Sequence, residues 1–279
     1  MAPFLHLGPV TIPTYGLMVA LGMLAAYYVL RADLARRGIA AQDSGMAELF
    51  IAVPGIAGII GAKLYSVLET PRDFFADPFG QLFSRFGLTW YGGMVAGAAT
   101  FAWLARRKKI PLLRMLDAGS PAASLGYAFG RMGCLLSGDG DYGIPTSLPW
   151  GMSFPNGLVP TTDHVHPTPI YESIVACLIA WVLWRLGARQ IALGKIQPQA
   201  GPGSAKGGAK GSGAGQASSA GPPQGAIFGA YLALTGVARF LVEFIRINPR
   251  VLWGLTNAQI VGILCVIAGA VLWFRKERG

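Results

Sequence analysis

The chain has 279 residues, of which 53% are hydrophobic and only 13% are charged, whereas a soluble domain carries about 25% charged residues. This composition excludes an ordinary soluble protein and indicates a membrane protein. In a soluble chain the formal net charge of +10 would favour a nucleic-acid partner, but in a membrane protein it fits basic cytoplasmic loops, so we expect no nucleic acid.

Seven stretches are long and apolar enough to cross a bilayer as helices, which takes about 20 mostly apolar residues. They cover residues 13–31, 46–68, 88–105, 113–135, 168–186, 225–245 and 256–274. The 39 glycines suit the close packing of helices in lipid. The predicted fold is therefore an all-α, polytopic membrane protein with seven transmembrane helices.

Lysines and arginines predict the orientation of these spans. Sixteen of them follow the first, third, fifth and last spans, and only four lie in the loops on the opposite side. Basic loops stay in the cytoplasm. We therefore expect the N-terminus outside and the C-terminus in the cytoplasm.

Two segments between the spans differ in composition. Residues 136–167 form a proline-rich outer loop region that holds two of the three histidines. Residues 197–224 consist largely of Gly, Ala, Ser and Pro, which cannot bury a core, so we expect a disordered cytoplasmic linker. Apart from these two regions, residues 1–279 are predicted to form a single membrane-embedded domain.

The first charge cluster lies at the outer end of the fourth span. Arg131 ends an apolar run, and Asp139 and Asp141 follow it among glycines. A charge inside a span costs about 2.5–3.5 kcal/mol on insertion scales, so it marks a functional site by default.

The second cluster lies in the segment TGVARFLVEFIRINPR at the outer end of the sixth span. Arg239, Glu243 and Arg246 are spaced i, i+4 and i+7, which places them on one face of a helix. Guanidinium groups that converge at headgroup depth fit the phosphate of a phospholipid, because each can bind two phosphate oxygens. The alternative is a set of internal ion pairs that only fix the packing.

Several other polar residues have two interpretations. Tyr15 and Tyr91 are predicted at outer span ends, where aromatic residues often serve as interfacial anchors. Cys134 is either a nucleophile or a small packing residue, and His166 could be a turn residue. Glu172 comes early in the fifth span, where a carboxylate suits a helix N-terminus.

The sequence predicts neither a metal site nor another cofactor. Its three cysteines form no CxxC pair, and its three histidines are scattered. A GxxxxGK[ST] phosphate loop is also missing, so nucleotide use is not indicated.

Six segments in order resemble the bacterial prolipoprotein diacylglyceryl transferase family. They are LGPVTIPTYGLM, GIIGAKLYSVL, LTWYGGMVAG, GRMGCLLSGDGDYGIPTSLPWG, HPTPIYES and TGVARFLVEFIR. The resemblance runs nearly end to end. The chain keeps the arginines and the glutamate of the family pattern, namely Arg131, Arg239 and Glu243. It departs from that pattern at Tyr91 (usually His), Cys134 and Ser137 (usually Asn), Asp139 (near a Glu) and Thr235 (usually Tyr).

The resemblance implies an enzyme of the bacterial inner membrane that works toward the outer leaflet. Such an enzyme transfers a diacylglyceryl group from phosphatidylglycerol to the lipobox cysteine of prolipoproteins, which is the first step of lipoprotein maturation. Its expected partners are phosphatidylglycerol, prolipoprotein signal peptides and membrane lipid, and we expect a monomer. The implied catalytic residues are Arg239, Tyr91, Glu243 and Tyr15, and the implied substrate-binding residues are Arg131, Arg239, Arg246, Gly92, Gly93, Asp139 and His166.

Each implied role has a chemical reason. Arg131 and Arg239 would stabilise the charge that develops on the leaving phosphate. The acceptor thiol reacts as a thiolate, so a base is needed, and Tyr91 is the candidate. Two alternatives stay open: a phospholipid-binding paralogue that is inactive or of different specificity, and a small-solute transporter, although no repeated halves are visible in the sequence.

Overall fold

The computed structural model describes residues 2–39, 45–83, 89–192 and 224–275. All but the last residue of the predicted linker 197–224 lie outside these residues. The chain divides into two compact units, each described here by itself. One comprises Met1–Gln42 with Leu116–Gly279, and the other comprises Asp43–Met115.

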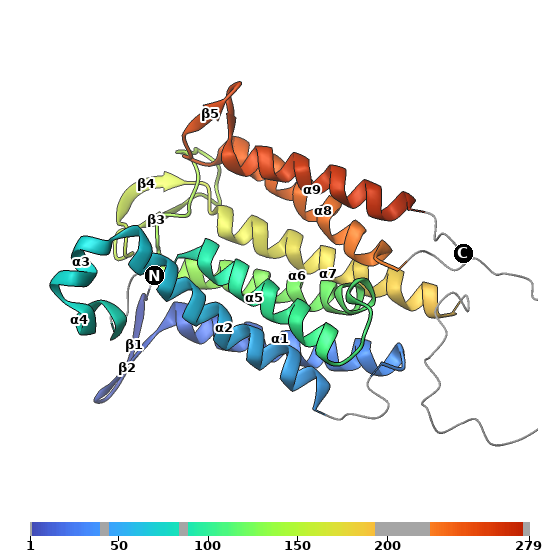
Figure 1. Ribbon diagram of the computed structural model, residues 1–279. Helices are drawn as coiled ribbons and strands as arrows, with labels where there is room; N and C mark the ends of the chain where they lie inside the picture. The colour runs from blue at the N-terminus through green and yellow to red at the C-terminus, as the bar shows by residue number, and fades with distance from the viewer. Residues whose placement is uncertain (1, 40–44, 84–88, 193–223, 276–279) are drawn as a thin grey trace, which may run out of the picture. The chain divides into compact units, whose positions relative to one another are not determined.

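Each predicted span corresponds to a helix of the structure (Figure 1). These helices are α1 (Thr14–Arg36), α2 (Met46–Glu69), α5 (Trp90–Arg107), α6 (Leu112–Ser137), α7 (Thr168–Ala192), α8 (Ala226–Val242) and α9 (Asn257–Phe274). Within the described ranges, five helical stretches are long and apolar enough to cross a membrane: α1, α2, α7, α9 and Ala226–Ile245, which extends α8.

The other two predicted spans correspond to α5 and α6, which are less apolar than these five stretches. Helix α5 has 18 residues and ends in Arg106 and Arg107. Helix α6 has 26 residues but includes Arg114, Asp117 and Arg131. An all-α membrane protein is therefore supported, while the count of seven spans remains a prediction.

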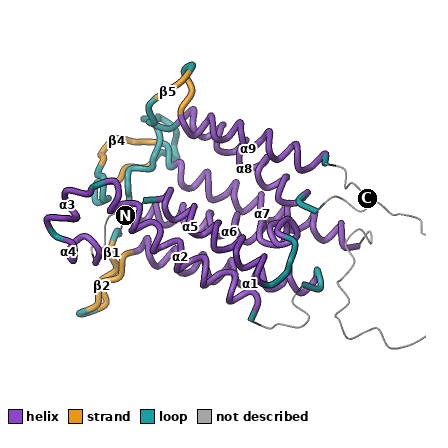
Figure 2. The backbone as a smooth tube through the Cα atoms, in the orientation of Figure 1, coloured by secondary structure: helices purple, strands orange, loops and turns teal. Residues whose placement is uncertain are grey.

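The all-α expectation omitted the antiparallel sheets, of which the described residues form three, each with two strands. They pair β1 (Phe4–Leu7) with β2 (Val10–Pro13), β3 (Met152–Phe154) with β4 (Thr161–Val165), and β5 (Arg250–Leu252) with β6 (Leu255–Thr256). All belong to the first unit, and they lie toward one end of its helices (Figure 2). The strands β3 and β4 fall within the predicted outer loop region 136–167, which is therefore partly ordered as a hairpin.

In the first unit the helices pack through small residues. Ser124 of α6 donates to the carbonyl of Ala176 on α7 at 2.9 Å, and Ser173 of α7 donates to the carbonyl of Ala128 at 2.9 Å. Helices α8 and α9 meet at glycines, since a Cβ added to Gly262 would lie 2.8 Å from the carbonyl oxygen of Gly236. Because small residues let backbones approach closely, they fix how the helix ends are placed.

One end of the first unit holds a buried ion cluster. Asp33 pairs with Arg36 and with Arg37, whose Nε lies 3.1 Å away. The Arg36 guanidinium lies 3.7 Å from the ring centroid of Trp184 on α7. Asp117 of α6 accepts the backbone N–H groups of Gly225 and Phe228, both at 2.8 Å, at the start of α8. Arg37 also interacts electrostatically with Asp117, so the end of α1, Asp117 of α6 and the start of α8 lie close together.

The second unit is built on the antiparallel pair α2 and α5, with the short helices α3 (Pro71–Ala76) and α4 (Pro78–Phe83) beside α2. Gly92 lies directly against the carbonyl of Gly61, and a Cβ at Gly93 would lie 3.2 Å from the carbonyl oxygen of Gly58. The two glycines predicted to bind substrate thus form the contact surface between α2 and α5. Their substrate role remains a prediction.

Candidate functional site

Three arginines and three carboxylates of the first unit converge where α6 and α8 end and α7 begins. Arg131 comes from the last turns of α6, and Arg239 from the last turn of α8. Arg246 follows the short 3-10 helix that extends α8. The carboxylates are those of Asp141, Glu172 and Glu243. We call these six residues the arginine cluster.

Glu172 contacts all three guanidinium groups. Its Oε2 lies 2.8 Å from Nε of Arg131, and its Oε1 lies 3.1 Å from Nη1 of Arg246 and 3.5 Å from Nη1 of Arg239. Only 5% of its side chain is exposed. The interpretation of Glu172 as a carboxylate that suits a helix N-terminus missed this role. The signal was available, because a carboxylate inside an apolar span requires a cationic partner.

Asp141 pairs with both Arg131 and Arg246. Its own backbone carbonyl accepts a hydrogen bond from the Thr168 hydroxyl at 2.6 Å, which fixes the loop against the start of α7. Burial alone would raise the pKa of Asp141, but the two guanidinium groups outweigh it and the pKa is lowered. This carboxylate therefore stays ionised near neutral pH.

Glu243 and Arg239 form the predicted i, i+4 pair, with Nη2 of Arg239 3.0 Å from Oε2 of Glu243. Asn248 also donates to Glu243 at 2.6 Å. The expectation that Arg246 continues the same helical face was wrong. The α-helix ends at Val242, and Arg246 is extended with φ −91° and ψ 160° because its backbone bridges to Gly143 instead of continuing the helix.

The charges of the arginine cluster balance, three against three, so the internal ion pairs considered as an alternative are present. Exposure distinguishes the arginines, because 31% of the Arg239 side chain is accessible against 10% for Arg131 and 8% for Arg246. Arg239 also makes the longest contact to Glu172, at 3.5 Å. Arg239 is consequently the guanidinium with the most surface left for an added anion.

A neutral donor completes the surroundings of Glu172. Tyr127 lies one helical turn before Arg131 on α6, and its hydroxyl donates a hydrogen bond to Oε2 of Glu172. No sequence pattern selects this tyrosine, because a tyrosine near a span end resembles an ordinary interfacial residue.

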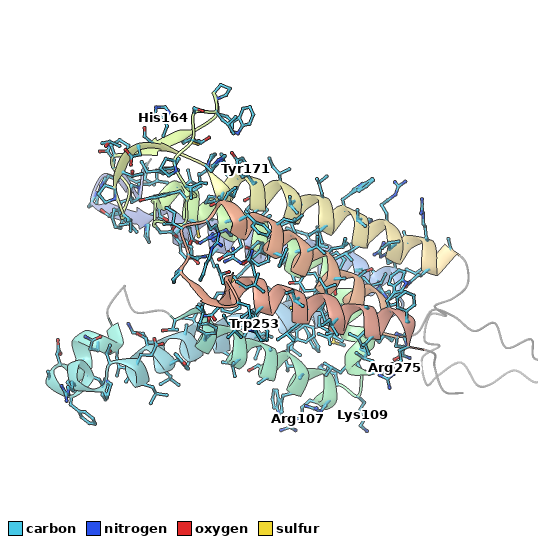
Figure 3. The ribbon with its side chains drawn as sticks, turned by 90° about the horizontal axis from the view of Figure 1, so that it is seen from above. Arg107, Lys109, His164, Tyr171, Trp253 and Arg275 are labelled. Atoms are coloured by element: carbon cyan, nitrogen blue, oxygen red, sulfur yellow. The ribbon has the colours of Figure 1, made fainter. Side chains whose placement is uncertain are left out.

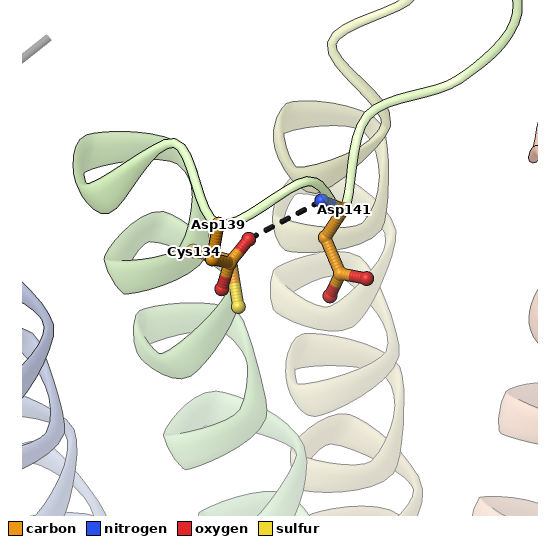
Figure 4. A group of neighbouring side chains, drawn as sticks. All are labelled: Cys134, Asp139 and Asp141. Carbon is orange, nitrogen blue, oxygen red and sulfur yellow. Dashed lines mark hydrogen bonds between the residues drawn. The ribbon is translucent and has the colours of Figure 1, made fainter. Parts of the chain in front are cut away.

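Asp141 of the arginine cluster lies close to Cys134 and Asp139, as Figure 4 shows. Their ligand atoms lie within 4.8 Å of one another, a spacing at which three such groups could hold a metal ion. However, Asp141 already binds two guanidinium groups, and Nη1 of Arg131 lies 3.5 Å from the Cys134 sulfur. Fixed positive charge at these atoms opposes a cation.

Asp139 was predicted to contact substrate, and Asp141 received no role. In the structure Asp141 holds the guanidinium groups, whereas Asp139 interacts with the Cys134 thiol and accepts the backbone N–H of Asp141 at 3.3 Å. Burial raises the pKa of Asp139, with the nearby charge of Asp141 adding to the rise. Its predicted contact with substrate remains a prediction.

Two other predicted site residues lie near the arginine cluster. Tyr15, at the start of α1, packs against α6, since a Cβ at Gly133 would lie 3.1 Å from its ring. His166 lies next to Tyr171, with a ring nitrogen 3.3 Å from the hydroxyl, to which Trp150 also donates at 2.8 Å. Figure 3 labels Tyr171 at the start of α7.

Tyr91, Gly92 and Gly93 belong to the second unit. Tyr91 is the second residue of α5 and is 57% exposed, and its ring meets that of Trp90 edge to face with centroids 5.4 Å apart. A function together with the arginine cluster therefore remains a prediction for these residues.

The fold and the site together define a helical membrane protein with an arginine–carboxylate cluster at the end of its helices. Comparison with known proteins is more specific. The chain belongs to the prolipoprotein diacylglyceryl transferase family, whose model matches residues 3–199 and 215–275.

Named relatives agree with this assignment. A phosphatidylglycerol–prolipoprotein diacylglyceryl transferase of Clostridium tetani is 30% identical over 94% of this chain and 94% of its own length. Proteins with the same name from Geobacter sulfurreducens and Finegoldia magna are 29% and 28% identical. They cover 87% and 95% of this chain, and 81% and 91% of their own lengths.

Proposed function

We propose that this protein transfers the diacylglyceryl group of phosphatidylglycerol to the cysteine thiol of a prolipoprotein lipobox, the first step of lipoprotein maturation. The observation that carries the proposal is the arginine cluster in a chain of this family, with one guanidinium, that of Arg239, still partly exposed. Guanidinium groups match phosphate oxygens in both charge and geometry.

We place the protein in the bacterial inner membrane with seven spans, the N-terminus outside and residues 1–279 forming one transferase domain. The arginine cluster is then at the outer leaflet. Two features of the first unit support this placement. Arg37, which follows the first predicted span, interacts electrostatically with Asp117, and Asp117 accepts a backbone N–H at the start of α8. The arginine cluster lies at the other end of α8, one helix length away.

In the proposed reaction the thiolate sulfur of the acceptor attacks the glyceryl carbon that bears the phosphate. A carbon–sulfur bond forms and the carbon–oxygen bond breaks, so that its electron pair moves to the phosphate oxygen and glycerol phosphate leaves. Negative charge grows on that phosphate in the transition state. Cations that are already in place stabilise such charge without reorganisation. We assign this role to Arg239 and Arg131. Arg246 supports them, since it shares the Glu172 carboxylate with both.

The acceptor thiol must lose its proton, because the thiolate is the nucleophile. Tyr91 is our candidate base, and Glu243 orients Arg239 through the 3.0 Å ion pair. Tyr15, Gly92, Gly93, Asp139 and His166 are proposed to line the substrate path. The proposed partners are phosphatidylglycerol and the signal peptide of a prolipoprotein, with the enzyme acting as a monomer.

The test combines complementation with a direct assay. The full chain is expressed in a bacterium depleted of its own transferase, and the purified protein is incubated with phosphatidylglycerol and a lipobox peptide. We expect growth to be restored and the peptide mass to increase by one diacylglyceryl group. Good membrane expression with neither result would contradict transfer and favour the phospholipid-binding paralogue.

A further inference from the structure

We propose that Tyr127 is a positioning residue for the transfer reaction: its hydroxyl orients the Glu172 carboxylate so that Arg239 stays available to phosphate. This inference rests on the proposed function and adds a residue to its machinery. The contact on which it depends is the hydrogen bond from the Tyr127 hydroxyl to Oε2 of Glu172.

The two oxygens of Glu172 have different hydrogen-bond donors. Oε2 accepts the hydrogen bond of the Tyr127 hydroxyl and lies 2.8 Å from Nε of Arg131, which is four residues further along the same face of α6. Oε1 accepts from all three guanidinium groups, those of Arg131, Arg239 and Arg246, at 3.2 Å, 3.5 Å and 3.1 Å. The Tyr127 hydroxyl therefore holds Oε2 against α6, while the three guanidinium groups share Oε1.

Tyr127 is a neutral donor. The other residues that donate hydrogen bonds to Glu172 in the described part of the chain are all arginines, which are cations. The terminal torsion of a glutamate side chain is broad and is not confined to sharp rotamers. If the hydroxyl is removed, only cations hold the carboxylate, and it can turn toward the loosely bound Arg239. A tighter Glu172–Arg239 pair would compete with the phosphate for the same guanidinium.

The placement of Tyr127 makes this role separable from packing. The residue is 44% exposed, so its ring contributes little to the core, although its hydroxyl reaches a side chain that is only 5% exposed. Thr235 of α8 does not supply a second hydroxyl, because its Oγ1 donates to the carbonyl of Tyr231 in its own helix at 2.6 Å.

The decisive variant is Tyr127→Phe in the full-length protein, which removes one oxygen atom and keeps the ring. We expect kcat to fall about tenfold or more, since tenfold corresponds to ~1.4 kcal/mol in the transition state. The inhibition constant of glycerol phosphate, the released product, should rise as well, because this anion needs the same guanidinium. The thermal midpoint should change by only a few degrees.

Tyr142→Phe is the matched control. The Tyr142 hydroxyl also donates one hydrogen bond, to the carbonyl of Val159 at 3.0 Å, but it does not contact Glu172. We expect this variant to keep kcat and the glycerol phosphate inhibition constant within twofold of wild type. A loss of equal size in both variants would mean a general structural effect and would overturn the inference.

Two further outcomes separate the inference from the function on which it rests. If the wild-type protein transfers lipid and Tyr127→Phe has unchanged constants, only the role of Tyr127 is overturned. If the wild-type protein transfers nothing to the lipobox peptide, the proposed function is contradicted and the role of Tyr127 falls with it.

Discussion

Replacing Glu172 by glutamine tests the arginine cluster most directly, because the change keeps the shape of the side chain and removes its charge. If the glutamine amide nitrogen takes the place of Oε2, it faces two donors, Nε of Arg131 at 2.8 Å and the hydroxyl of Tyr127. If the amide is turned the other way, the contacts of Oε1 with Arg131, Arg239 and Arg246 are lost instead. Either orientation leaves at least two donors without an acceptor.

A hydrogen bond to a charged group contributes about 1.5–3 kcal/mol, so two lost contacts cost roughly 3–6 kcal/mol. For domains of 150–250 residues each kcal/mol lowers the thermal midpoint by about 2–4 °C, which gives a decrease of roughly 6–24 °C for Glu172→Gln. Because the arginines then repel one another without their shared partner, we also expect kcat/KM to fall at least about 100-fold, or ~2.7 kcal/mol.

The measurements are a thermal melt in detergent and transfer to a lipobox peptide followed by mass spectrometry. Asp163→Asn is the control, since it makes the same chemical change on an exposed residue of β4. The control should match wild type in both assays. A Glu172→Gln protein with a wild-type midpoint and turnover within twofold would refute the idea that this carboxylate organises the arginines.

Four more outcomes follow from the site and the topology. Arg131→Ala and Arg239→Ala should each abolish transfer while the protein still inserts, with lysine restoring it only in part because lysine lacks the bidentate fork; near-normal turnover in either alanine variant would remove that residue from the mechanism. Deleting residues 200–220 should leave turnover close to wild type, since this composition supports no packed structure, and a tenfold loss at unchanged expression would contradict that. Tyr91→His should be tolerated, because imidazole titrates closer to neutral pH than a phenol, whereas Tyr91→Phe should reduce transfer. The measurement is the pH–rate profile of each variant. Identical profiles for Tyr91→Phe and wild type would make Tyr91 an interfacial anchor. The lowered pKa of Asp141 stabilises the folded protein above the ordinary aspartate pKa of about 3.9, and this contribution is lost as pH falls through the lowered value. Asp141→Asn should therefore lower the thermal midpoint at neutral pH and flatten its decline below about pH 4, whereas parallel curves would argue against the ion pairs.

The sequence by itself determined that the protein is helical and apolar and where its long helices lie. Hydrophobic runs of about 20 residues are a local property, and each predicted span is occupied by a helix. The i, i+4 pair of Arg239 and Glu243 was predictable for the same reason, since neighbouring turns of one helix set its geometry.

Only the tertiary structure decided which residues meet across helices. Glu172 lies 67 residues before Arg239 and 41 after Arg131, and no local pattern connects them. Arg246 could not be placed from its helical spacing, because an interaction with the distant Gly143 replaces the last helical turn. Tyr127 gained its contact with Glu172 only because α6 and α7 pack side by side. Spacing along the chain determines the faces of single helices, whereas packing between helices determines the arginine cluster.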